Sequence, residues 1–275
     1  MDGEPAPRAP EYPFTEWQRR TRDAVRRLKG RPRACGLNAF RCLERAWLIA
    51  ALDPEMSLLR AVTAEEEAAT ALIFALQQKV YPGSGKLNHR QHAHKAGIYP
   101  FLRIVEGFLA ECGFPAPEMT LRIDGAKPRM ELRFPVGGGL FAQPDEPLNG
   151  VTHENPFGEP RILDFGRQAQ DHADVKGAAD MLDVIRREAN LRNRLLYATD
   201  EGINVVSGVD GDLLARGKPV TLLLGLAIAV LQTPMHQLFA VQVLEGYLKA
   251  IKKVPEDPFD YASALSGHVR VTRMP

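Results

Sequence analysis

The stretch LNAFRCLERAWLIAAL, residues 37–52, decides the fold class. Its apolar side chains recur every three or four residues: Leu37, Phe40, Leu43, Trp47 and Ala50. That spacing is typical of one face of an α-helix. Asp53-Pro54 predicts the end of the helix, because the residue before a proline disfavours the α region. We therefore expect a helix over residues 37–52 with one face in a protein core.

The same helical period recurs along the chain, over residues 63–80, 100–112, 174–199, 219–231 and 238–251. Thr63 and Glu66 have the spacing of a capping box, which predicts that the second helix starts there. The run Val220–Leu231 is apolar on all sides, so we expect it to be buried. Its length of about twelve residues is too short for a bilayer, which needs roughly 20.

Between residues 117 and 165 the period changes from helix to strand. Apolar residues alternate with polar ones on both sides of Asp124-Gly125, a dipeptide that favours a hairpin turn. Pro128 predicts an edge or irregular strand, and residues 161–165 could add a short strand. The sequence thus predicts a mainly α protein: a single helical bundle of about six helices with a small β-rich insertion at about 117–165.

This bundle defines one helical domain, residues 34–254. A Pro-rich lead-in and basic arm, residues 1–33, precede it, and a loosely ordered tail, residues 255–275, follows. We expect residues 202–217 to form a loop, because they are rich in glycine and aspartate.

The composition is that of a globular protein without a strong charge bias. There are 35 Lys and Arg against 34 Asp and Glu, a net charge of +1, which argues against a protein covered with phosphate contacts. The three cysteines form no Cys-x-x-Cys pair, and the first residues lack the apolar core of a secretory signal. We expect a cytoplasmic protein without a membrane segment.

Residues 15–33 form a basic amphipathic segment, with eight Arg and Lys against Glu16 and Asp23. Together with Phe14 and Trp17, these cations could grip phosphates and stack on bases. The alternative is a surface helix whose apolar stripe packs on the bundle while its arginines face water.

Arg192 and Asn193 flank the apolar stripe of the segment 174–199. At about 100° per residue, Arg192 lies only about 20° outside the arc of that stripe, and Asn193 borders the other side. A guanidinium near a core needs acceptors. They could come from a carboxylate such as Glu44 or Glu66, from a partner chain, or from a phosphate ligand.

The run Arg192-Asn193 followed by Tyr197 resembles the Arg-x4-6-His signature of the HEPN superfamily, in which Arg-Asn often opens the motif. The helical pair at 37–80 also resembles the first helices of such bundles. The resemblance implies a compact, often dimeric bundle, and many members are metal-independent ribonucleases of toxin and phage-defence systems. It assigns Arg192 to the scissile phosphate, Asn193 to its orientation, and Tyr197 to the usual place of the histidine. A tyrosine with a pKa near 10 is a poor general base at neutral pH.

A second candidate is the loop of residues 86–95, which is rich in histidine and basic side chains. We interpret it as a phosphate-facing loop; a solvated connector and a metal site are the alternatives, the latter disfavoured by the cations and by the lack of carboxylates. The predicted nucleic-acid-binding residues are Lys86, His89, Arg90, His92, His94, Lys95 and Arg194.

The leading hypothesis is a HEPN-like protein that cleaves or binds RNA as a homodimer, with Arg192, Asn193 and Tyr197 as its catalytic residues and no metal or cofactor. The alternative is a non-catalytic adaptor that binds a protein partner through the basic arm or the β insertion. A third is a small-ligand pocket among the apolar last helices.

Overall fold

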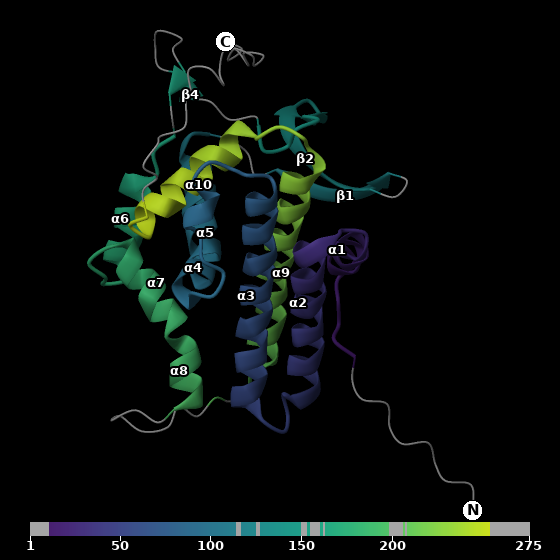
Figure 1. Ribbon diagram of the computed structural model, residues 1–275, viewed down its shortest axis with the longest axis vertical. Helices are drawn as coiled ribbons and strands as arrows, with labels where there is room; N and C mark the ends of the chain where they lie inside the picture. Colours follow the sequence, from purple (N-terminus) through teal and green to yellow (C-terminus); the bar gives the residue numbers. More distant parts are fainter. Residues whose placement is uncertain are drawn as a thin grey trace, which may run out of the picture.

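The computed structural model describes residues 11–113, 117–124, 127–149, 153–154, 160–161, 163–197, 206 and 208–253. The protein is mainly α-helical with a small β insertion, as predicted (Figure 1). The helices are α1 Glu16–Arg26, α2 Gly30–Ile49, α3 Pro54–Gln78, α4 His92–Ala96, α5 Ile98–Glu111, α6 Gly166–Val175, α7 Met181–Ala189, α8 Leu191–Leu196, α9 Asp210–Gln232 and α10 Leu238–Ala250, with a short 3-10 turn η1 at Ser84–Lys86.

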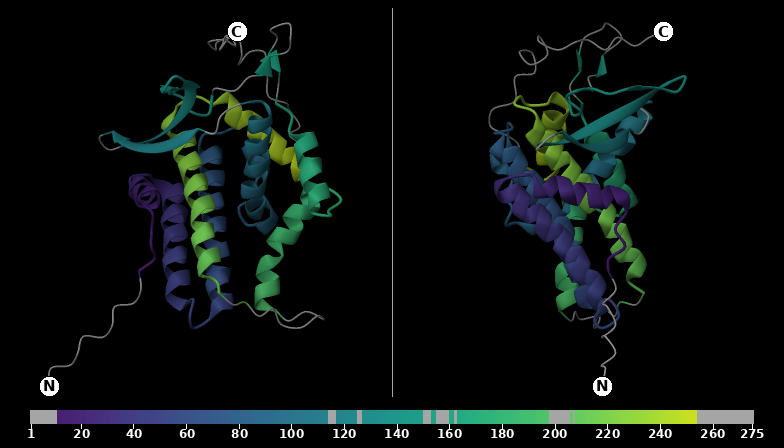
Figure 2. Two further views of the ribbon diagram at one scale, coloured as in Figure 1. Left: turned by 180° about the vertical axis from the view of Figure 1, so that it is seen from behind. Right: turned by 90° about the vertical axis from the view of Figure 1, so that its right-hand side faces the viewer.

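Three long helices, α2, α3 and α9, pack against one another and form the centre of the core. Their contact faces carry many alanines, such as Ala39, Ala68 and Ala227, which are fully buried and let the backbones approach closely. Figures 1 and 2 show α1 lying across one side of this layer and α4–α8 on the other side. The layer therefore separates the basic N-terminal helix from the helices that carry Arg192 and the histidine-rich loop.

The β insertion sits against the end of α9. Strand β1, Glu118–Asp124, pairs antiparallel with β2, Lys127–Gly137, which pairs in turn with β3, Leu140–Ala142. The register Leu121 opposite Met130 confirms the predicted hairpin, although Gly125 of its turn lies outside the described residues. Gln232 of α9 accepts from the Met130 amide at 2.7 Å and donates to its carbonyl at 3.0 Å, which ties the sheet to the core.

The pairing of the strands tests two predictions, the edge position of Pro128 and the short strand expected at residues 161–165. Pro128 lies where β2 has β1 on one side and, within the described residues, no strand on the other, because β3 pairs only from Phe134 onward. That agrees with the expected edge position. The last short strand, β5, is Pro160–Arg161 paired with β4, His153–Glu154, whereas the described residues Leu163–Phe165 are not strand.

The second helix does not start at the predicted capping box. Helix α3 begins at Pro54, and Asp53 caps it by accepting from the Met56 amide at 2.9 Å. Proline suits a first helical position, because its missing N–H has no partner there in any case. Thr63 lies inside the helix and donates its hydroxyl to the Leu59 carbonyl. The Glu66 side chain is therefore available for other contacts.

The predicted helix over 174–199 is three helices, α6, α7 and α8. Gly177, at φ +59°, separates α6 from α7, and Asp180 caps α7 through the Asp183 amide. Helix α8 ends at Leu196, and Thr199 lies outside the described residues. Helix α2, which was expected over residues 37–52, also starts earlier than predicted, at Gly30.

Helix α9 begins at Asp210 and contains Pro219, so the helix expected over 219–231 starts earlier, and the loop predicted at 202–217 is wrong from residue 210 onward. The missing N–H at Pro219 is tolerated inside a helix that the surrounding core holds in place. By length and composition α9 could cross a membrane, but 67% of its most apolar window is buried inside the protein. It packs along α3 as a core helix does.

The basic segment forms α1 and the first turns of α2. Thr15 and Gln18 make a capping box, and Phe14 and Trp17 pack against the core. Several of its arginines are paired: Arg20 with Glu16, Arg22 with Glu44 and Arg26 with Asp23. The structure thus favours the surface-helix alternative here. The predicted lead-in up to residue 10 and the tail from residue 255 lie outside the described residues.

Gln237 joins three parts of the fold, which gives a test of the packing. This fully buried side chain accepts from the Leu148 amide and donates to the Ala229 carbonyl, both at 2.8 Å. Gln237→Ala leaves both backbone groups unpaired and should lower the free energy of unfolding by about 3 kcal/mol. Gln78→Ala, an exposed glutamine at the end of α3, is the control, with a change within about 0.5 kcal/mol in urea unfolding. Equal losses in the two variants would contradict this packing.

Candidate active site

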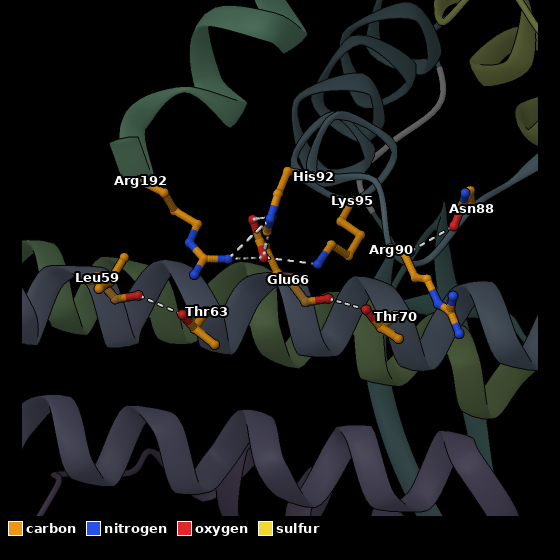
Figure 3. A network of polar contacts seen from close by, with 9 residues as sticks. All are labelled: Leu59, Thr63, Glu66, Thr70, Asn88, Arg90, His92, Lys95 and Arg192. Atoms are coloured by element: carbon orange, nitrogen blue, oxygen red, sulfur yellow. Dashed lines mark hydrogen bonds and ion pairs between the residues drawn. The ribbon is translucent and has the colours of Figure 1, made fainter. Parts of the chain in front are cut away.

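The centre of the candidate site is the carboxylate of Glu66, which lies in the middle of α3. Its side chain is only 5% exposed. His92 Nδ1 lies 2.9 and 3.1 Å from the two carboxylate oxygens, and Lys95 donates to Oε2 at 3.0 Å. Figure 3 shows both side chains descending from α4 onto Glu66. A buried charge is costly unless it is paired and hydrogen-bonded, and these two partners provide that pairing.

Helix α4 presents these two side chains because His92 and Lys95 are three residues apart, which places them on the same helical face. Buried Tyr247 of α10 holds the helix in place by donating to the carbonyls of Ala93 and His94 at 3.3 and 3.1 Å. Burial raises the pKa of this tyrosine well above its usual value, so its hydroxyl remains a donor. The helix also approaches α7 closely, since a Cβ on Gly97 would lie 2.7 Å from Ile185.

Arg192 of α8 reaches the same carboxylate from the other side. Its Nη1 lies 3.5 Å from Glu66 Oε2 and 3.4 Å from each ring nitrogen of His92. The sequence offered Glu44 or Glu66 as intramolecular partners; Glu66 takes this place, while Glu44 pairs with Arg22. The Arg192 side chain is still 29% exposed. It therefore pairs inside the chain and also faces an open groove.

The groove beside this cluster has a volume of about 670 Å³ and lies between α4 and the α7–α8 segment. Its polar lining consists of three guanidinium groups, one imidazole, two amides and one phenol. Among the residues that the structure describes, no aspartate or glutamate lines it. The lining side chains are His92, Ala93, Arg186, Arg187, Ala189, Asn190, Arg192, Asn193, Leu196 and Tyr197. Around Glu66, Lys95 and Arg192 face one carboxylate, and Arg186 adds a further cation to the groove lining. The groove is suited to an anion such as a phosphate.

His92 and Glu66 form a carboxylate–imidazole pair. When Nδ1 donates its proton to the carboxylate, Nε2 is left as the acceptor, which is how a carboxylate orients a histidine base. The His92 side chain is 47% exposed and lines the groove, so this nitrogen can meet a bound ligand. A charged guanidinium next to such a base can stabilise a developing negative charge. The arrangement can perform general acid–base chemistry on a phosphate ester.

The contact of His92 with Glu66 and Arg192 was not predicted from the sequence. The HEPN-like motif places Tyr197 where its histidine would stand, and His92 was predicted only as a phosphate-binding residue. The available signal was Glu66: a carboxylate in the middle of an apolar, alanine-rich helix needs partners. Which partners it finds depends on how α4 and α8 pack, and no local pattern specifies that.

The other predicted catalytic residues also line the groove. Tyr197, at the end of α8, is 66% exposed. Asn193 donates through Nδ2 to Oδ1 of Asn190 at 2.9 Å. Arg194 is exposed on the same helix but does not line the groove.

The loop of residues 86–95 divides between the site and the surrounding structure. Lys86 ends the turn η1 and is exposed, His89 packs on the Phe74 ring with centroids 4.8 Å apart, and Arg90 points away from Glu66 (Figure 3). His94 is buried and accepts from the Asn88 amide at 2.9 Å. Burial lowers the pKa of this imidazole, so it stays neutral. Only His92 of this loop borders the groove through its polar side chain, and Lys95 supports it through Glu66.

Two further cavities border the core. One, of about 660 Å³, lies between α3, α9 and the helices α4–α8, and contains the pair Arg216–Glu65 at 2.6 Å. Burial raises the pKa of the Glu65 carboxyl. The other is apolar, about 80 Å³, and lies among α3, α5, α9 and α10, where the sequence left room for a small-ligand pocket. Among the described residues, no three His, Cys, Asp or Glu side chains gather in a way that could hold a metal ion.

Comparison of the chain with protein-family models, with curated proteins and with solved structures finds no match.

Glu66 should contribute to stability as well as to the site. Glu66→Ala leaves Lys95, whose side chain is 11% exposed, without its carboxylate and should lower the free energy of unfolding by about 3 kcal/mol. Glu106→Ala removes a carboxylate from an exposed pair with Arg103 and should cost less than about 1 kcal/mol. Urea unfolding of both variants measures the difference, and a cost for Glu66→Ala as small as the control would contradict the pairing.

His94 should make the protein sensitive to acid. Its pKa is lowered from 6.5 in the folded state, so the unfolded chain binds the proton more tightly. The stabilisation is present above about pH 6.5 and is lost as the pH falls below that value. His94→Asn keeps an acceptor for the Asn88 amide and should unfold with a weaker pH dependence. Urea midpoints at pH 7.5 and 5.5 test this, and an unchanged pH dependence would count against it.

Proposed function

We propose that this protein binds RNA in the groove between α4 and α7–α8 and cleaves it without a metal ion, as a HEPN-like ribonuclease of the cytoplasm. One observation carries the proposal: the Glu66–His92 pair lies beside Arg192 at the edge of a groove lined by cations. A general base and a phosphate-binding guanidinium are the two groups that such a reaction needs. The HEPN resemblance of Arg192-Asn193 supports the same assignment.

The proposed reaction uses the ribose 2′-hydroxyl as nucleophile. His92 Nε2 takes the proton of this hydroxyl, while Glu66 stabilises the imidazolium that forms. The 2′-oxygen bonds to the adjacent phosphorus, and the bond from phosphorus to the 5′-oxygen breaks. That oxygen leaves with a proton from water or Tyr197, which gives a 2′,3′-cyclic phosphate and a 5′-hydroxyl end. Arg192 turns from the imidazole to the phosphate, a stronger acceptor.

This assignment differs from the family pattern in the origin of the histidine. His92 stands on α4 and Arg192 on α8 of the same chain, 100 residues apart. One chain therefore supplies both groups, and a second copy is not needed to bring them together. A homodimer, which the resemblance implies, could still extend the RNA-binding surface.

The non-catalytic adaptor is the second candidate, because Arg192 is paired with Glu66 inside the chain. This pairing reduces the charge available to a phosphate and could make Arg192 chiefly structural. Exposed apolar side chains on the insertion, Leu140 and Phe141, offer a surface for a protein partner. In this case the protein binds RNA or a protein but leaves RNA intact.

Cleavage of end-labelled single-stranded RNA in the presence of a chelator separates these candidates. His92→Ala should lower kcat/KM by about 10²–10⁴-fold, the usual contribution of a general base, and Arg192→Ala by about 10²–10³-fold. Arg167→Ala, which removes an exposed arginine of α6 that does not line the groove, should cleave like the wild type. RNA with a single 2′-deoxy sugar at the cleavage position should stay intact there.

The stability of each variant is checked by circular dichroism and thermal unfolding. Equal cleavage by all three variants would overturn the assignment of the site. RNA binding without cleavage by the wild type would favour the adaptor.

A further inference from the structure

We infer that the groove contains a second phosphate subsite on α7, built around Arg186 with Asn190, which holds the strand one or more nucleotides away from the reacting phosphate. This inference rests on the proposed function, because it names how the same groove would hold its substrate. It involves residues outside the HEPN-like motif, and its ligand is the phosphodiester of a neighbouring nucleotide.

The subsite follows from a stripe of polar residues along α7 and α8. Arg186, Asn190, Asn193 and Tyr197 are spaced i, i+4, i+7 and i+11, the spacing of one helical face, and all four line the groove. Asn190 joins the two helices with φ −77° and ψ −8°, and Tyr197 follows α8 in an extended conformation. Residues 186–196 are helical apart from this junction and extend at most about 15 Å, the length of several nucleotides at roughly 3.4 Å per stacked base.

Arg186 is the cation of this stripe that remains available for a ligand. It is exposed, and within the described part of the chain it forms no ion pair. Its neighbour Arg187 is held by Asp183 at 2.6 Å, and Arg192 is shared with Glu66 and His92. A guanidinium without a carboxylate partner can bind a phosphate through two parallel hydrogen bonds.

Asn190 adds a donor beside Arg186. Its Oδ1 accepts from Asn193 Nδ2 at 2.9 Å, which orients the amide and leaves its own Nδ2 for a ligand in the groove. Phosphate oxygens commonly accept from such side-chain amides in nucleic-acid complexes.

Tyr197 lies at the opposite end of the stripe from Arg186. Its ring is largely exposed, and in the described residues no ring contact and no side-chain hydrogen bond involve it. An exposed aromatic ring at the end of a basic groove is a stacking platform for a base. The order along the groove is then a phosphate at Arg186, the reacting phosphate at Arg192 and His92, and a base on Tyr197. The substrate is a single strand of at least three nucleotides.

The test compares Arg186→Ala with Arg167→Ala, the arginine control outside the groove, on RNA oligonucleotides of two to eight nucleotides. For the longer oligonucleotides Arg186→Ala should raise KM about tenfold with little change in kcat. For a dinucleotide, which has a single phosphodiester, the variant should match the wild type. Loss of one phosphate contact should also reduce the slope of log affinity against log salt by about 0.7.

Fluorescence anisotropy with a 2′-O-methyl oligonucleotide, which cannot be cleaved, measures the subsite separately from the chemistry. Weaker binding of this probe to Arg186→Ala, but not to Arg167→Ala, supports the subsite even if the wild type cleaves no RNA, an outcome that would remove only the proposed ribonuclease activity. Wild-type KM and affinity in Arg186→Ala would overturn the subsite and leave the ribonuclease proposal standing. A wild type that neither binds the probe nor cleaves RNA would overturn both.

Discussion

The buried carboxylate of Glu66 is the constraint on which the site depends. A carboxylate that is 5% exposed in the middle of a core helix costs several kcal/mol unless cations and hydrogen-bond donors surround it. Helix α4 supplies an imidazole and an ammonium, and α8 supplies a guanidinium. The same contacts therefore dock two peripheral helices on α3 and gather three functional groups. Stability and site geometry here have a common origin.

Because Glu65 and Glu66 are adjacent in the sequence, α3 forms ion pairs on two different faces. Adjacent residues on a helix point about 100° apart. Glu66 turns toward His92 of α4 and Arg192 of α8, whereas Glu65 pairs with Arg216 of α9, and both glutamate side chains line the second cavity. The two carboxylates thus pair with different cations, and neither is among the described residues that line the groove. The overall net charge of +1 conceals this local separation.

Periodicity was sufficient to predict the architecture, since the helical faces around Leu43, Ile73 and Leu244 are buried as their spacing indicates, and the hairpin around Leu121 and Met130 follows from alternation. Local capping signals were less reliable. Thr63 and Glu66 match a capping box, but Pro54 is an equally good start nine residues earlier, and packing of α3 along α2 favours the longer helix. Pro219 is likewise held inside α9 by tertiary contacts.

The contact between His92 and Arg192 joins segments 100 residues apart in the sequence. A sequence pattern could therefore place Arg192 beside a core, but it could not identify the histidine that lies next to it.

The claim that Glu66 organises His92 and Arg192 into one centre is tested most directly by a double-mutant cycle on RNA cleavage with Glu66→Gln and His92→Ala. If the carboxylate acts through the imidazole, the double variant should be hardly slower than His92→Ala alone, with a coupling energy well above 0.5 kcal/mol. Multiplicative losses in kcat/KM, with each substitution acting independently, would contradict the account.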